Sequence, residues 1–67
     1  MDISQTHSRL IRLQAERFEA VELGVEPPSP YLARLDAAIA EARVEYVTSA
    51  VREIALLRRS LTGAAQG

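Results

Sequence analysis

The chain contains no cysteine, tryptophan, lysine or asparagine, and its only histidine is His7. Without cysteine there can be no disulfide and no thiolate metal site, and one histidine cannot form a histidine cluster. A chain of 67 residues has a marginal hydrophobic core, which is usually supplemented by a disulfide, a metal or a partner. By elimination, the sequence predicts that a second copy of the chain or a larger partner protein supplies the extra stability.

Excess charge and long apolar runs are also missing. Eight arginines stand against nine acidic residues, so no basic surplus favours binding of a polyanion. No apolar run approaches the ~20 residues of a membrane span. Residues 1–4 lack the basic and apolar regions that begin a signal peptide. We therefore expect a cytoplasmic protein that does not bind a membrane.

The stretch 30–62 has the features of one long helix. Ser29 can accept a hydrogen bond at the N-cap, and Pro30 has the fixed φ of a first helical position. No further glycine or proline occurs until Gly63. Apolar residues recur at alternating spacings of four and seven, an eleven-residue repeat of roughly 3.67 residues per turn. They are Leu35, Ile39, Tyr46, Ala50, Leu57 and Leu61. This stripe predicts a helix that packs against another helix.

A first helix is predicted over residues 3–23. At about 100° per residue, one face collects its main apolar residues, and Leu13 and Ala20 widen that face along one flank. The residues of this face are Ile3, Leu10, Ile11, Phe18 and Val21. Gly24 can adopt the left-handed conformation that ends many helices. The turn 24–29 contains prolines that exclude both helix and sheet pairing.

Such a short connection makes the two helices antiparallel neighbours. The predicted fold class is therefore all-α: an antiparallel two-helix hairpin, one domain over residues 1–62, followed by a flexible tail over 63–67. At 1.5 Å per residue the helices are ~32 Å and ~50 Å long, so the second projects beyond the first. We expect such hairpins to assemble into a four-helix bundle, most simply as a homodimer. The design resembles the small helical-hairpin RNA-binding regulators of plasmid copy number in architecture, without a shared motif.

The short turn also predicts which residues face each other. Opposite residues have numbers that sum to about 53, so Arg17 faces Asp36 and His7 faces Tyr46. An Arg–Asp pair adds little net stability but penalises other registers. Gln14, on the apolar face of the first helix, is typical of a residue that fixes register or partner number in a bundle. We interpret these five residues as determinants of hairpin register.

The projecting end of the second helix is rich in apolar residues that its own hairpin cannot cover. They are Ala50, Ile54, Leu56, Leu57 and Leu61. An uncovered apolar patch of this kind marks an interaction site. The alternative is that the last two turns fray and that the end is disordered.

Catalytic patterns are missing from the sequence, which has no glycine-rich loop, no Ser/His/acid set and no HExxH. Glu41 and Glu45 stand four residues apart and could hold a metal only with ligands from another chain. Glutamates at this spacing are more often a solvated face. We therefore predict that the protein is not an enzyme and has no cofactor or metal.

Two functions remain open. The first is a non-enzymatic protein–protein interaction module, an adaptor, regulator or assembly subunit, that acts through the apolar end of the second helix. The second is a dimeric nucleic-acid-binding regulator that uses Arg9 and Arg12, or Arg52 and Arg59. The acidic residues of the second helix would repel phosphate, so nucleic acid is the less favoured partner. The sequence leaves open the partner's identity and the relative orientation of the hairpins.

Overall fold

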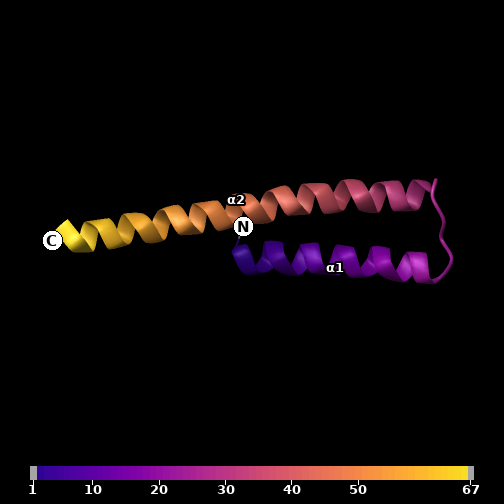
Figure 1. Ribbon diagram of the computed structural model, residues 1–67, viewed down its shortest axis with the longest axis horizontal. Helices are drawn as coiled ribbons and strands as arrows, with labels where there is room; N and C mark the ends of the chain where they lie inside the picture. The colour runs from indigo at the N-terminus through magenta and orange to yellow at the C-terminus, as the bar shows by residue number, and fades with distance from the viewer. Residues whose placement is uncertain (1, 67) are drawn as a thin grey trace.

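The computed structural model of the protein describes residues 2–66, of which 63–66 are described by their backbone alone. Two helices pack side by side: α1 spans Ile3–Glu22 and α2 spans Pro30–Gln66 (Figure 1). No strand occurs within residues 2–66. The prediction of an all-α hairpin with a longer second helix is confirmed.

The helix ends depart from the predicted bounds. α1 ends at Glu22, one residue early, and α2 continues to Gln66 rather than ending at Thr62. Gly63 costs only about 1 kcal/mol relative to alanine inside a helix, and the alanines and glutamine that follow it favour helix. The helix therefore continues through Gly63. Flexibility of the predicted tail 63–67 stays a prediction, and Gly67 lies outside the described residues.

The turn begins with a helix cap of the Schellman type. Gly24 has a φ of 99°, and its N–H donates to the carbonyl of Val21 at 3.0 Å. The N–H of Val25 donates to the carbonyl of Ala20, also at 3.0 Å. These two bonds satisfy carbonyls that the end of α1 would otherwise leave unpaired. Val25 then packs against the buried cluster that includes Leu32, which directs the chain back toward α2.

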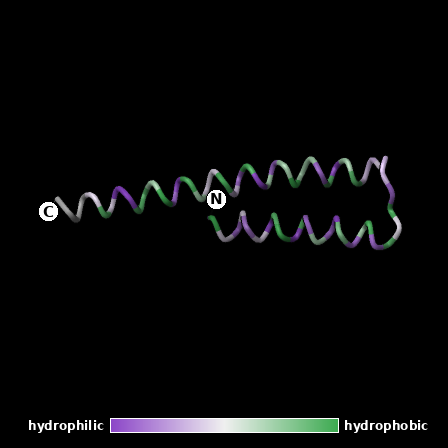
Figure 2. Tube along the Cα trace, viewed as in Figure 1, coloured by the Kyte–Doolittle hydropathy of each residue, from purple (hydrophilic) through white to green (hydrophobic). Residues whose placement is uncertain are grey.

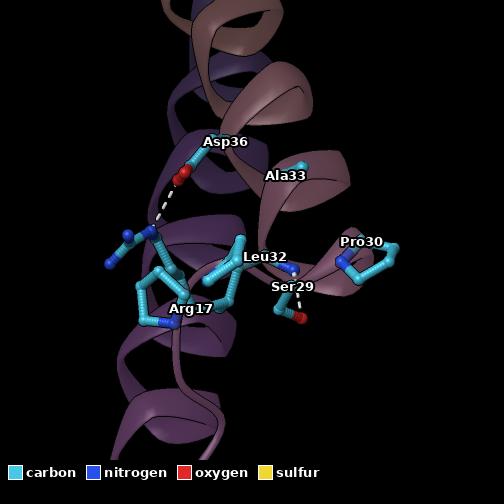
Figure 3. A pocket seen from close by; sticks show the side chains of 8 residues that line it. Arg17, Ser29, Pro30, Leu32, Ala33 and Asp36 are labelled. Atoms are coloured by element: carbon cyan, nitrogen blue, oxygen red, sulfur yellow. Dashed lines mark hydrogen bonds and ion pairs between the residues drawn. The ribbon is translucent and has the colours of Figure 1, made fainter.

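The start of α2 is capped as the sequence predicts. The backbone N–H of Leu32 donates to the Ser29 hydroxyl oxygen at 3.3 Å (Figure 3), and the N–H of Ala33 donates to the Ser29 carbonyl at 2.9 Å. Pro30, the first residue of the helix, needs no such partner because it has no N–H. The cap fixes where α2 begins and so fixes the register of the hairpin.

The hydrophobic core consists of two small clusters between the helices. One contains Leu10, Ile39 and Ala42, and the other contains Ala20, Leu32 and Leu35; Leu13 packs against both. On α2 the core residues, continued by the half-buried Tyr46, follow spacings of three and four. This is the spacing of a coiled-coil seam. Leu35, Ile39 and Tyr46 of the predicted stripe belong to it, and Leu32 and Ala42 complete it.

The predicted apolar face of α1 is partly wrong. Phe18 is 68 % exposed and Ile11 is 51 % exposed, whereas Thr6, Leu10 and Ala20 are buried. The prediction centred the face on all the apolar residues of the helix. A single neighbouring helix covers only a narrow stripe of such a broad apolar arc, so the side that carries Ile11 and Phe18 stays uncovered.

The molecule is a rod. Its dimensions are 60 × 15 × 14 Å and its radius of gyration is 17.3 Å, against roughly 11 Å for a compact chain of this length. α1 begins beside the middle of α2, and the rest of α2 extends alone (Figure 1). Every residue from 51 to 62 is exposed. We call residues 51–66 the overhang.

Candidate interaction surface

Both residue pairs that the register predicts are in contact. Arg17 Nε donates to Asp36 Oδ1 at 2.5 Å (Figure 3). The rings of His7 and Tyr46 stack with centroids 5.1 Å apart and an interplanar angle of 26°. The ion pair is partly solvated, so it contributes at most ~1 kcal/mol. Whether these residues select the register over its alternatives stays a prediction.

A third contact between the helices was missed. Arg9 Nη1 donates to Glu45 Oε2 at 2.6 Å, and both side chains are partly buried. The sequence alone places Arg9 on a possible nucleic-acid surface and Glu45 at a possible metal site. The residue numbers of Arg9 and Glu45 sum to one more than the value that the register predicts. A search for opposite charges at this register therefore finds the pair. Both side chains hold the hairpin together here.

The turn end carries one further hydrogen bond. The Tyr31 hydroxyl donates to Glu16 Oε1 at 2.7 Å. This bond is the main cause that raises the pKa of Tyr31 above its usual value of 10.0, and desolvation and the charges of Glu16 and Glu19 add to the shift. The contact joins the start of α2 to the last turns of α1.

The recess beside the turn is a poor candidate for a chemical site. It has a volume of about 450 Å³, and prolines of the turn line it together with Arg17 and Asp36 (Figure 3). Its two charged groups are bonded to each other, so neither is available to orient a ligand. Among residues 2–66, no three His, Cys, Asp or Glu side chains gather where they could hold a metal ion.

Gln14 lies in a shallow recess on the side of the hairpin. The recess has a volume of about 410 Å³, and Phe18, Ala40 and Arg43 also line it. Gln14 is exposed in the single hairpin. A role in fixing partner number therefore requires a second molecule and stays a prediction.

The predicted interaction residues lie on and next to the overhang, and their role in binding stays a prediction. Ile54 is 52 % exposed, Leu57 is 58 % exposed and Leu61 is 71 % exposed. Ala50 is half-buried, and Leu56 is exposed. In Figure 2 hydrophobic segments recur along this uncovered part of α2, between hydrophilic ones. The overhang thus combines helical order with an apolar side that nothing in the hairpin covers.

The apolar side of the overhang forms a stripe of its own, which we call the interaction seam. Its members follow spacings of three and four, as in a coiled coil. They are Val47, Ala50, Ile54, Leu57 and Leu61. The hairpin's core stripe, continued at the same spacing, would instead pass through Ser49, Glu53, Leu56 and Ser60. At heptad spacing the interaction seam thus runs one residue away from the continued core stripe, and Leu56 lies outside it.

The apolar surface continues from the interaction seam onto the hairpin. Val47 lines a recess together with Ala40 and Val44, and Ala40 also lines the recess beside Phe18. The uncovered side of α1 thus adjoins the Val47 end of the interaction seam. Arg43 is the charged residue that lines both recesses.

The chain matches no protein-family model, and no characterised protein or solved structure is significantly similar to it. No helix in the described part of the chain is long and apolar enough to cross a membrane.

Proposed function

We propose that the chain is a non-enzymatic protein–protein interaction module, an adaptor, regulator or assembly subunit, that binds through the interaction seam. The observation that supports this proposal is the exposure of Ile54, Leu57 and Leu61 on a helix end beyond the reach of α1. Burial of such a side chain is worth ~1.5–3 kcal/mol. The partner is a second copy of the chain or a larger protein that offers an apolar groove or helix face.

The weak support of the overhang favours the same proposal. Residues 51–66 have no helix beside them, and isolated helices of roughly this length are only marginally stable in water. This segment nevertheless keeps strong helix formers and a regular apolar stripe, as expected for a helix that a partner covers. The partner stabilises the helix, and the helix presents the interaction seam.

Nucleic-acid binding receives less support. Arg9, one of the arginines that a polyanion would need, is bonded to Glu45. Arg52, Arg58 and Arg59 are exposed, but they share the overhang with Glu53. A complex with RNA or DNA would weaken steeply between low and moderate salt, whereas an apolar interface would not. Titration with mixed RNA and with duplex DNA at two salt concentrations separates the two functions.

Leu57→Asp tests the proposed function, with Ala55→Asp as its matched control. Both variants place one carboxylate on the overhang, but at about 100° per residue position 55 lies on the side away from Leu57. Self-association is measured by sedimentation equilibrium up to about 100 µM, and partner capture is measured in extracts at native expression. We expect Leu57→Asp to abolish association or capture and Ala55→Asp to retain it. If both variants behave as the unaltered chain does, the interaction seam is not the binding surface.

A further inference from the structure

We infer that the partner on the interaction seam is a second copy of this chain in parallel orientation. The two α2 helices pair like residue with like residue from Val47 to Leu61, and both turns point to the same end. This inference rests on the proposed interaction function and names its partner and geometry. Three features support it: the residue types in the interaction seam, the charges beside it and the position of Arg43.

Three of the five residues of the interaction seam are of the types found in a parallel two-helix coiled coil. With Val47 at the first core position of the heptad, Ile54 and Leu61 take the same position, and Ala50 and Leu57 take the second. β-Branched residues at the first position with leucine at the second favour parallel two-stranded packing. Val47, Ile54 and Leu57 fit this rule. The structure leaves all three more than half exposed in the single chain.

The charges beside the interaction seam are complementary in the parallel arrangement. Glu53 and Arg58 flank the seam on opposite sides and stand five residues apart, the spacing at which flanking residues of two parallel helices meet. Glu53 of each chain then lies beside Arg58 of the other, and two-fold symmetry makes two such pairs. Neither residue forms an ion pair within the described part of the chain, and both are exposed.

The antiparallel arrangement lacks this complementarity. Its best apolar register places Ile54 opposite Leu57 and Ala50 opposite Leu61. Glu53 then lies beside Ser60, and Arg58 lies beside Val51, so neither charge meets an opposite one. The charge pattern therefore favours the parallel copy.

Arg43 sets the end of the contact that lies nearer the turn, next to Val47. It occupies the core position one turn before Val47, and in a parallel pair two Arg43 side chains would meet there. Since like charges at facing positions are destabilising, the two helices diverge below Val47. α1 packs on another side of α2, roughly a quarter of a turn from the interaction seam at 3.5 residues per turn. Ala50 is half-buried in the single hairpin, so two hairpins meet mainly through Ile54, Leu57 and Leu61, beyond the end of α1.

A distance between the two turns tests the orientation directly. The chain has no cysteine, so Glu26→Cys places a single spin label in the exposed turn. Each hairpin is about as thick as two helices, so a parallel pair puts the labels within roughly 40 Å of each other. An antiparallel pair puts them roughly 80 Å apart, because each turn lies ~40 Å from the midpoint of the interaction seam. Pulsed dipolar spectroscopy distinguishes these distances.

Charge exchange tests the flanking pairs. Glu53→Arg and Arg58→Glu, each alone, place like charges together at two sites and should weaken dimerisation roughly fivefold or more. The double variant restores opposite charges and should regain most of the affinity. Arg59→Glu, which changes the same type of charge outside the flanking positions, is the matched control and should leave dimerisation nearly unchanged.

The results separate this inference from the function on which it rests. A dimer with the short label distance and the charge-exchange rescue supports the parallel copy. A dimer with the long distance, or without rescue, overturns the inference but keeps the interaction seam as the binding surface. A chain that is monomeric at about 100 µM also overturns the inference. If that chain captures another protein, and Leu57→Asp does not, the proposed function is kept. If Leu57→Asp loses neither association nor capture, both the parallel-copy inference and the proposed function are overturned.

Discussion

The two halves of α2 have similar apolar spacings and opposite environments. In residues 30–46, Leu32, Leu35 and Ile39 are buried against α1, whereas in the overhang Ile54 and Leu57 are more than half exposed. Both halves carry apolar residues at spacings of three and four. The difference arises from the length of α1, which begins at Ile3 and reaches only to the middle of α2. Periodicity therefore shows that a helix face is suited to packing, and a neighbour's length decides whether the chain itself covers it.

The largest expected effect comes from the covered half. Leu35→Ala removes buried methyl groups from one of the two core clusters and should cost ~2–5 kcal/mol of hairpin stability. Circular dichroism should show loss of helicity in α1 and α2 at any protein concentration, because the contact is within one chain. Phe18→Ala, at an exposed site on α1, is the control and should leave the helicity of the single hairpin nearly unchanged. Equal losses in both variants would contradict the two-cluster core.

Leu57→Ala is the matching change in the uncovered half. If Leu57 is buried in the assembly, the change should cost ~2–5 kcal/mol of association free energy. Since this burial comes from binding, the loss appears as a lower melting temperature that depends on protein concentration. Melting curves over a hundredfold range of concentration measure it. If Leu57→Ala instead melts as Leu35→Ala does, without concentration dependence, the proposed difference between the covered half of α2 and the overhang is contradicted.

Exchange of the Arg17–Asp36 pair has a smaller effect. Arg17→Asp and Asp36→Arg each destroy the 2.5 Å contact and place like charges together, while the double variant restores an opposite-charge pair. The pair is partly solvated, so the coupling measured in a double-mutant cycle by urea unfolding should not exceed ~1 kcal/mol. A coupling of zero would mean that this pair does not contribute to the register of the covered half.

The smallest effect concerns Tyr31, whose hydrogen bond to Glu16 raises its pKa above 10.0. A raised pKa in the folded state means that the stabilisation is fully present below the unfolded pKa of about 10 and is lost as pH rises through the folded value. The urea midpoint of the unaltered chain should therefore exceed that of Tyr31→Phe at pH 8, and the difference should shrink at pH 11. A difference that grows with pH would contradict this sign.

Local signals allowed much of the hairpin to be predicted from sequence. Ser29-Pro30 and Gly24 fix where one helix begins and the other ends, and the short turn fixes which residues face each other. The contacts of Arg17 with Asp36 and of His7 with Tyr46 lie at that register. These features depend on residues close in sequence or on the length of one turn, so they need no knowledge of packing.

Other features depend on information that local patterns do not contain. The apolar arc of α1 is wider than one neighbour can cover, so its pattern did not reveal that Phe18 lies outside the contact. α2 passes Gly63 because the residues after it favour helix, so a single glycine is a weak signal for the end of a helix. For the interaction seam, one sequence supplies only one half of an interface. Charge and residue type are the features of this one chain that bear on its partner.

The overhang also has a consequence for cooperativity. α2 is one continuous helix of 37 residues, but only its first part is held by α1. Backbone amides of the first part can exchange with solvent only when the hairpin unfolds, whereas amides of the overhang exchange through local fraying at little free-energy cost. A partner on the interaction seam would extend slow exchange to the overhang and let both parts melt in one transition. Whether this chain unfolds in one step or in two is then a property of the assembly, although every residue involved belongs to the same helix.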